Sequence, residues 1–275
     1  MRRIILVGIL VLASLTSGIA RGQEKHGIDT LQCHMVGVTA GVLMPIDGSN
    51  SLGLQAGNMK DLYTGPYLNF AFEWDYKFKS GWMPSLDADL WFGYNSDNLT
   101  QRVERMGDIF TSQGYLMSWS GYDGVVTMYN RGLAVRPGVG KLIPLFKKNP
   151  DSGILLKVSG GWFMQKTINT QDMSESEVPQ LAEKYMKIYD HLRNGVIMTQ
   201  GIGFLYMSNR GRYVNFKVML EVSECWSWST RPYILDNVMG LNGKDESRYF
   251  DLMVGMKLGW LFPFTGKTSY DYYYY

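Results

Sequence analysis

The sequence is poor in the residue types that most catalytic and disulfide-stabilised folds require. It contains two cysteines, Cys33 and Cys225, and three histidines in 275 residues. Two cysteines are too few for a disulfide scaffold, and no histidine stands at a telling spacing from a serine or cysteine that could serve as a nucleophile. No phosphate-binding glycine loop, zinc spacing or calcium loop occurs. We therefore expect no enzyme, no cofactor and no metal.

Long apolar runs are also scarce. After residue 15 no stretch is apolar for 18 residues, which excludes a transmembrane helix in the rest of the chain. The formal net charge is only +2, so nothing indicates a nucleic-acid partner. What the chain does have is 14% aromatic residues and 31 glycines, a composition that leans towards β structure.

The N-terminus has the pattern of a secretory signal peptide. Arg2 and Arg3 precede an apolar stretch over residues 4–15, and the small residues Ala20 and Gly22 follow. The alternative, a membrane anchor, is weaker because an apolar run of about 12 residues is shorter than the roughly 20 needed to span a bilayer. We expect residues 1–22 to be removed, which leaves 24 basic and 25 acidic residues and a net charge of about −1.

Alternation of apolar and polar residues with a period of two is the main structural signal. On one face of residues 249–262 lie Phe250, Leu252, Val254, Met256, Leu258, Trp260 and Phe262, while the other face mixes charges with glycine. The same pattern recurs in eight segments, at 34–44, 65–78, 82–94, 132–146, 153–167, 195–208, 212–225 and 248–262. A soluble half-buried strand also alternates, but a long aromatic-ended apolar face is typical of a membrane barrel.

The connections between these segments alternate between long and short. Residues 45–64, 95–131, 168–194 and 226–247 are long, whereas residues 79–81, 147–152 and 209–211 are tight turns. Outer-membrane barrels have short periplasmic turns and long extracellular loops, whereas a soluble sandwich or lipocalin-like barrel has no reason for such segregation. The sequence thus predicts an all-β, eight-stranded antiparallel transmembrane barrel over residues 34–264, with periplasmic segments at 23–33 and 265–275.

A short motif in the last predicted strand carries a resemblance to a known class. Lys257, Gly259, Phe262 and Phe264 are spaced like the terminal-strand signal that the outer-membrane barrel assembly machinery reads, although 11 residues follow it here. The whole mature chain resembles OmpA-type eight-stranded barrels, and residues 178–190 with the aromatic tail look like small barrels of Bacteroidota. The resemblance implies an integral outer-membrane location in a Gram-negative bacterium, contact with outer-membrane lipid, and the assembly machinery as a partner during biogenesis. Some such barrels are accessory parts of machines for type 9 secretion or barrel assembly.

The predicted inward faces concentrate charge in the barrel lumen. Pairing about the turn at residues 79–81 places Glu73 opposite Asp87 and Ala71 opposite Asp89, and carboxylates so close would repel one another unless neutralised. We expect a cross-lumen salt-bridge network; its members are Glu73, Asp75, Asp87, Asp89, Arg136, Lys157, Lys217, Glu221, Asp251 and Lys257. A cation bound by the carboxylates is the rival interpretation. Since eight strands enclose a space that side chains fill, the lumen should conduct poorly.

Two further segments suggest docking to protein partners. Val178, Leu181, Tyr185, Ile188 and Leu192 recur at spacings of three and four, which predicts an amphipathic helix in the third long loop. The chain ends with Tyr270 and then Tyr272, Tyr273, Tyr274 and Tyr275. The helix either packs on the barrel rim or docks in a partner's groove. The tyrosines are either disordered, lie in the membrane interface or bind a periplasmic partner.

These features favour a non-enzymatic accessory or scaffold subunit of an outer-membrane protein machine, active in secretion or barrel assembly. A free-standing structural barrel, adhesin or narrow pore is the alternative, and a lipid-acting enzyme has the least support.

The alternating connections predict the orientation of the chain. An epitope tag inserted in residues 110–120 or 230–243 should be accessible to antibody on intact cells, because these connections are expected outside. A tag after Tyr275 should become accessible only in permeabilised cells. Labelling of the C-terminal tag on intact cells would contradict the orientation.

Overall fold

The computed structural model describes residues 31–46, 55–56, 66–93, 117–122, 126–171, 191–208, 215–230 and 248–264. Nine strands form in this part of the chain: β1 (Cys33–Ile46), β2 (Gln55–Ala56), β3 (Tyr67–Lys77), β4 (Trp82–Gly93), β5 (Val126–Phe146), β6 (Asn149–Gln171), β7 (His191–Met207), β8 (Asn215–Ser229) and β9 (Arg248–Phe264). Across the described ranges no helix has the length and apolar character needed to cross a membrane.

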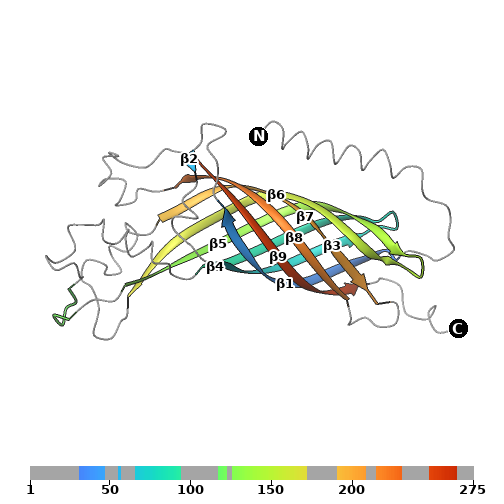
Figure 1. Ribbon diagram of the computed structural model, residues 1–275, viewed down its shortest axis with the longest axis horizontal. Coiled ribbons are helices and arrows are strands. Elements are labelled where there is room, and N and C mark those ends of the chain that lie inside the picture. The colour runs from blue at the N-terminus through green and yellow to red at the C-terminus, as the bar shows by residue number, and fades with distance from the viewer. Residues whose placement is uncertain are drawn as a thin grey trace.

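The eight long strands close into an antiparallel barrel (Figure 1). Each long strand pairs with the next one along the chain, and β1 also pairs with β9 from His34–Phe264 to Ile46–Leu252. The predicted eight-stranded antiparallel barrel is confirmed. The two-residue β2 was not predicted. It pairs in parallel with Tyr249 and Phe250 of β9, near Leu252, the residue of β9 with which the last residue of β1 pairs.

The period-two pattern determines which side chains face the lumen. In β3 and β8 buried and exposed residues alternate almost without exception. The exposed positions carry large apolar side chains, such as Phe70 and Phe72 in β3 and Leu220 and Val222 in β8. The buried positions of the same strands include Glu73 and Lys217. The barrel is therefore apolar outside and charged inside, the reverse of a soluble protein.

The short connections that the structure describes lie at one end of the barrel. One runs over residues 78–81 and another over residues 147–148. The first turn depends on Gly81, whose φ is +79° and whose added Cβ would lie 2.8 Å from the carbonyl oxygen of Leu142. Glycine adopts this backbone conformation without strain. We call this end the short-turn end and the opposite one the long-connection end.

Several predicted boundaries were too conservative, most clearly in β5 and β6. The fourth long strand begins at Val126, not at residue 132, and the fifth ends at Gln171, not at residue 167. The reason is that β5 and β6 pair with each other from Val126–Gln171 onwards, beyond the point where β4 ends at Gly93 opposite Asn130. The part of this ladder beyond β4 does not enclose the lumen. Its residues therefore need not alternate between apolar and polar, and the period-two pattern was weak in this part of the sequence.

The predicted helix in the third long loop is wrong at its last position. Leu192 lies in β7, where it pairs with Lys166 of β6; pairing with a neighbouring strand prevails there over the helical spacing. Val178, Leu181, Tyr185 and Ile188 lie outside the described residues. So do residues 1–30, which include the expected signal peptide, and the tail at 265–275.

Candidate functional site

A layer of buried charges crosses the lumen. Its members come from six strands and are each no more than 5% exposed; they are Glu73, Asp75, Asp87, Asp89, Arg136, Lys157, Lys217, Glu221 and Lys257. The register places Glu73 opposite Asp87 and Ala71 opposite Asp89, as expected from the sequence. Asp251 is buried as well but lies farther along the lumen, opposite Cys225 in the ladder between β8 and β9.

The four cations are distributed so that each contacts at least two carboxylates. Lys217 Nζ pairs with Glu73 and lies 3.1 Å from Asp75 Oδ2. Lys157 Nζ donates to Asp87 Oδ1 at 2.7 Å and lies 3.7 Å from Asp75 Oδ1. These contacts join β3, β4, β6 and β8 across the lumen.

The second half of the layer is built around Asp89. Arg136 donates to Asp89 Oδ2 from Nε at 2.9 Å and from Nη2 at 2.5 Å, a two-pronged contact that holds the carboxylate in one orientation. Lys257 Nζ lies 2.5 Å from Asp89 Oδ1 and 2.9 Å from Glu221 Oε2. Arg136 Nη1 also donates to the Thr199 hydroxyl at 2.5 Å. Five carboxylates are thus held by four cations, and the layer is nearly neutral.

Apolar side chains fill the lumen on both sides of the charged layer. Towards the short-turn end lie Cys33, Met35, Met83, Leu142, Leu155, Leu205, Met207, Met219 and Leu261. Towards the long-connection end lie Leu43, Tyr67, Trp91, Ala134, Phe163, Ile197, Cys225 and Met253. The Trp91 ring lies against Gly132, where an added Cβ would be 1.9 Å from the ring. The two cysteines therefore belong to layers on opposite sides of the charges.

The chain before β1 closes the mouth at the short-turn end. The backbone N–H of Leu31 donates to Asp151 Oδ1 at 3.1 Å, and the Leu31 carbonyl accepts from Lys77 Nζ at 2.9 Å. Lys77 Nζ also lies 2.5 Å from Asp151 Oδ1. Because β6 is four strands away from β1 in an eight-stranded ring, this contact spans the mouth, and Leu31 packs on the methionine-rich layer.

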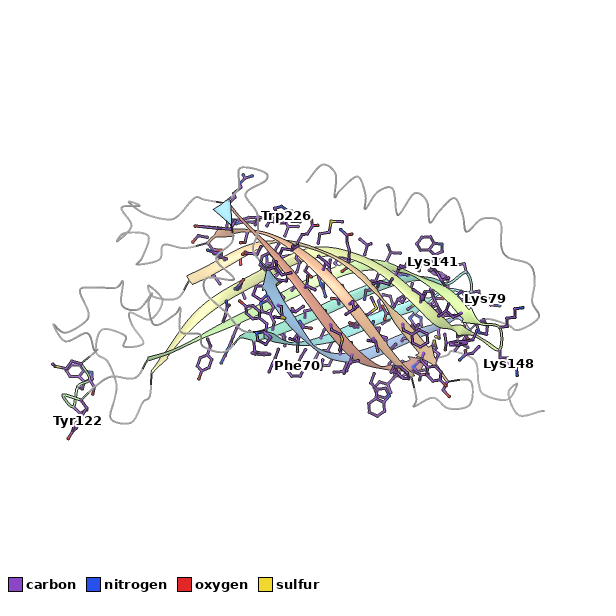
Figure 2. The ribbon with its side chains drawn as sticks, viewed as in Figure 1. Phe70, Lys79, Tyr122, Lys141, Lys148 and Trp226 are labelled. Atoms are coloured by element: carbon purple, nitrogen blue, oxygen red, sulfur yellow. The ribbon has the colours of Figure 1, made fainter. Side chains whose placement is uncertain are left out.

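The outer wall is apolar and bears aromatic side chains near both ends (Figure 2). At the short-turn end Tyr76 contacts His34 and Phe78, with ring centroids 4.5 and 4.8 Å away. Towards the other end Trp228 is exposed, and the ring of Trp226 lies 5.6 Å from that of the buried Phe250. Exposed Leu, Val and Met side chains, such as Leu220 and Met256, occupy the wall between these ends.

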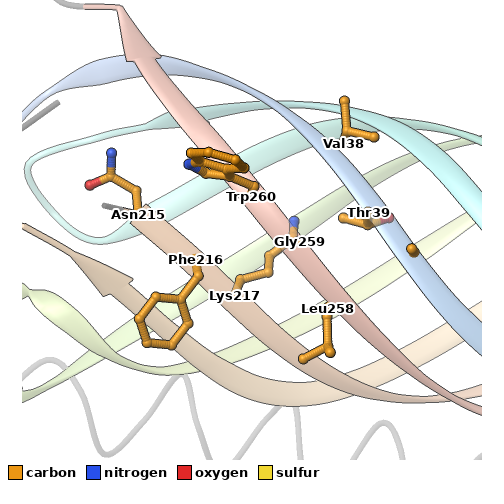
Figure 3. Close-up of a pocket in the computed structure, with 9 residues that line it drawn as sticks. Val38, Thr39, Asn215, Phe216, Lys217, Leu258, Gly259 and Trp260 are labelled. Carbon is orange, nitrogen blue, oxygen red and sulfur yellow. The ribbon is translucent and has the colours of Figure 1, made fainter. Parts of the chain in front are cut away.

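A hollow of about 500 Å³ lies in the described wall over β1, β8 and β9 (Figure 3). The aromatic rings of Phe216 and Trp260 stand beside it, with Leu258 and Val38. Lys217 also borders it, but its ammonium group is paired with Glu73 and Asp75. The lining of the hollow is therefore an apolar surface without a free charged group.

Comparison with known proteins gives matches in structure only. No protein-family model matches the chain, and no curated protein matches its sequence. The structure is similar to Ail, the attachment invasion locus protein of Yersinia pestis, solved in complex with the heparin analogue sucrose octasulfate, with a TM-score of 0.42, 8% identity and coverage of 85% of this chain and 100% of Ail.

Two other solved structures are similar at lower scores. Neisserial surface protein A has a TM-score of 0.28 and 10% identity, over 82% of this chain and 95% of its own. The outer membrane protein OprG of Pseudomonas aeruginosa has a TM-score of 0.31 and 9% identity, over 84% and 96%. The features of this barrel that bear on function are its own closure, lumen and wall.

The motif residues at the end of β9 occupy different environments. Lys257 belongs to the charged layer, and Gly259 lies where a Cβ would come within 2.6 Å of Thr39 Cγ2. Phe262 and Phe264 pair with Val36 and His34 of β1 at the seam that closes the barrel. In the described chain no group of three or more His, Cys, Asp or Glu side chains is arranged to hold a metal ion.

Sequence reasoning missed two parts of the lumen. One is the contact of Lys77 and Asp151 with the Leu31 backbone. Lys77 lies two residues after Asp75 and four after Glu73, so the alternation in β3 directs its side chain into the lumen as well. That alternation could have indicated that Lys77 needs a partner in the lumen. The other is the pair of apolar layers, which inward-facing methionines and leucines such as Met83 and Leu142 could have indicated.

Removing one cation from the charged layer should be costly. We expect Lys217→Met to reduce the free energy of unfolding by about 3–5 kcal/mol, because Glu73 and Asp75 stay buried without their partner. The double variant Lys217→Met with Glu73→Gln should recover part of this loss. The free energy of unfolding can be measured by urea titration of the protein folded into phospholipid vesicles. The folded fraction is monitored by the gel shift between the folded and the heated form.

The matched control is Lys141→Met, a substitution of a lysine at the outer surface that bonds to the Ser80 carbonyl. It should cost about 1 kcal/mol or less. Equal losses for Lys141→Met and Lys217→Met would contradict a cross-lumen ion-pair network.

Proposed function

We propose that the protein is an integral outer-membrane barrel of a Gram-negative bacterium that works as a non-enzymatic accessory or scaffold subunit of a protein machine. The observation that carries the membrane location is the inverted polarity of the barrel: large apolar side chains such as Phe72, Leu220 and Leu258 are more than half exposed, whereas the charges are buried. In water such a surface would drive aggregation, whereas hydrocarbon is its natural solvent.

The dimensions of the wall support this proposal. On β8, Phe216 and Trp226 are ten residues apart, and their ladder partners on β9 are Trp260 and Phe250. Ten residues of strand measure about 33 Å, which a strand tilt of about 40° reduces to roughly 25 Å along the barrel axis, the height of the apolar band in outer-membrane barrels. Trp260 and Trp226 then lie near opposite membrane interfaces, where the amphipathic Trp ring is favoured.

The filled lumen argues against transport as the main activity. A solute would have to displace two apolar layers and break the ion pairs between them. The surfaces left for function are the two ends of the barrel. The long connections and the C-terminal tyrosines support a role in holding protein partners, in secretion or barrel assembly. The proposed orientation, with the C-terminus in the periplasm, follows from the short turns at that end.

A conductance measurement tests the closed lumen. Purified protein inserted in a planar lipid bilayer should show no steady open channel, because ordered side chains occupy the whole cross-section. Insertion should be verified on the same sample by protease protection of the barrel. An ohmic conductance of porin size from inserted protein would overturn the filled-lumen mechanism.

Deletion of residues 267–275 tests the scaffold role. The motif residues Lys257 to Phe264 and all eight strands remain, so the truncated protein should insert and stay heat-modifiable. Proteins that copurify with the full-length chain from detergent-solubilised outer membranes should be lost, because buried aromatic anchors contribute about 2 kcal/mol or more each. Replacement of Tyr270 and Tyr272–Tyr275 by phenylalanine is the matched control, which keeps the apolar area and removes the hydroxyls. Unchanged copurification after the deletion would favour a free-standing barrel.

A further inference from the structure

The most exposed aromatic side chains of the described chain do not lie on the lipid-facing wall. Trp119 is 75% exposed and Tyr122 is 71% exposed, more than any large apolar side chain of the barrel strands, and Met117 beside them is 47% exposed. They belong to residues 117–122, which we call the aromatic tip. The tip lies in the connection between β4 and β5, beyond the long-connection end, and Figure 2 places Tyr122 far from Lys79 and Lys148 at the short turns.

The aromatic tip is a tight hairpin held by its own hydrogen bonds. The Ser118 N–H donates to the Tyr122 carbonyl at 2.9 Å, and the Gly121 N–H donates to the Ser118 carbonyl at 3.0 Å. Gly121 has a φ of +80°, which completes a three-residue loop of the type that ends on a left-handed glycine. Trp119 therefore sits at the apex of a preformed turn, and a partner that binds it has little backbone entropy to overcome.

Two strands of the barrel wall project on the side of the tip. The ladder between β5 and β6 continues for four residue pairs past Asn130, from Tyr129–Ile168 to Val126–Gln171. Four pairs extend the ladder by about 14 Å. Tyr122 is four positions before the start of β5. Figure 2 shows Tyr122 beyond these strands and away from the lipid-facing wall.

The chemistry of the tip identifies the kind of surface that it fits. Residues 117–122 contain no charged side chain, so the tip lacks the basic residues with which peripheral segments bind anionic lipid or sulfated glycans. The Ser118 and Ser120 hydroxyls bond to each other at 2.7 Å, and Ser118 Oγ also accepts from the Ser120 N–H. The hydroxyls support the turn, which leaves the aromatic rings as the means of recognition.

We propose that the aromatic tip is a docking knob for a partner protein with an uncharged apolar socket, which receives Trp119 and Tyr122. Its combination of Trp and Tyr with Ser and Gly matches the composition of binding loops in antibodies, where rigid rings supply contact area at low entropy cost. Trp and Tyr are also the residues most enriched in binding hot spots. The inference rests on the proposed scaffold function and specifies the surface and the partner chemistry.

In-cell photocrosslinking tests which class of molecule contacts the tip. Benzoylphenylalanine placed singly at Trp119 or Tyr122 should give one discrete protein adduct, identified by mass spectrometry. The same probe at Thr230, which is exposed at the same end of the barrel at the end of β8, should not give it. Adducts only to lipopolysaccharide or phospholipid, an adduct to a second copy of this chain, or equal labelling from Thr230 would overturn the proposal.

Affinity measurements with the identified protein then test the knob itself, with the barrel held in lipid nanodiscs. Trp119→Ala and Tyr122→Ala should each weaken binding by about 30-fold, and Trp82→Ala on the barrel wall should leave it unchanged. Gly121→Ala keeps both rings but strains the turn, so it should also weaken binding; equal affinity to the wild type would overturn the preformed turn. Unchanged affinity of the Trp119 and Tyr122 variants would overturn the proposal that the aromatic tip is a docking knob. The scaffold role fails on a different result, namely that the full-length protein copurifies with no partner.

Discussion

The pairing of β1 with β9 is the constraint on which the other features depend. Thirteen register positions join the first and last long strands, from His34–Phe264 to Ile46–Leu252, and they leave the sheet without an open edge along the barrel. In hydrocarbon an unpaired backbone N–H or C=O costs several kcal/mol, so only a closed ladder allows strands to face lipid. Closure also fixes the lumen, because it directs every second side chain inwards from all eight strands.

The charged layer is a consequence of that closed geometry. A narrow lumen brings Glu73, Asp87 and Asp89 within reach of lysines from strands on the far side, such as Lys157 and Lys257. The layer connects strands that share no backbone hydrogen bonds, so it fixes the cross-section of the barrel as well as its register. A buried pair is weak evidence for net stabilisation, but loss of one partner is costly, which makes the layer selective for one arrangement of strands.

The two ends of the barrel differ in physical character. At the short-turn end the Leu31 backbone, Lys77 and Asp151 close the mouth, and the turns leave little surface for recognition. At the other end β5 and β6 project past their neighbours, and the aromatic tip extends farther still. Since the lumen is filled, specificity for a partner has to reside in these projecting parts and in segments outside the barrel.

Much of the barrel was predictable because period-two alternation is a local property of the chain. It placed all eight long strands, and the turn at residues 79–81 was enough to predict that Glu73 faces Asp87. The same reasoning failed where pairing is decided by a neighbour: at Val126–Tyr129, where β6 extends β5, at the two-residue β2, and at Leu192, where helical spacing competes with a place in β7.

The sequence by itself determined the strand number, the inward and outward faces and the nine charges of the cross-lumen layer, because each follows from parity along a single strand. Only the tertiary structure decided which cation meets which carboxylate, that apolar layers seal both sides of the charges, and that Leu31 reaches Asp151 across the mouth. These contacts join residues up to 168 positions apart, and their geometry depends on the stagger and tilt of a closed barrel. Parity along one strand carries no information about either quantity.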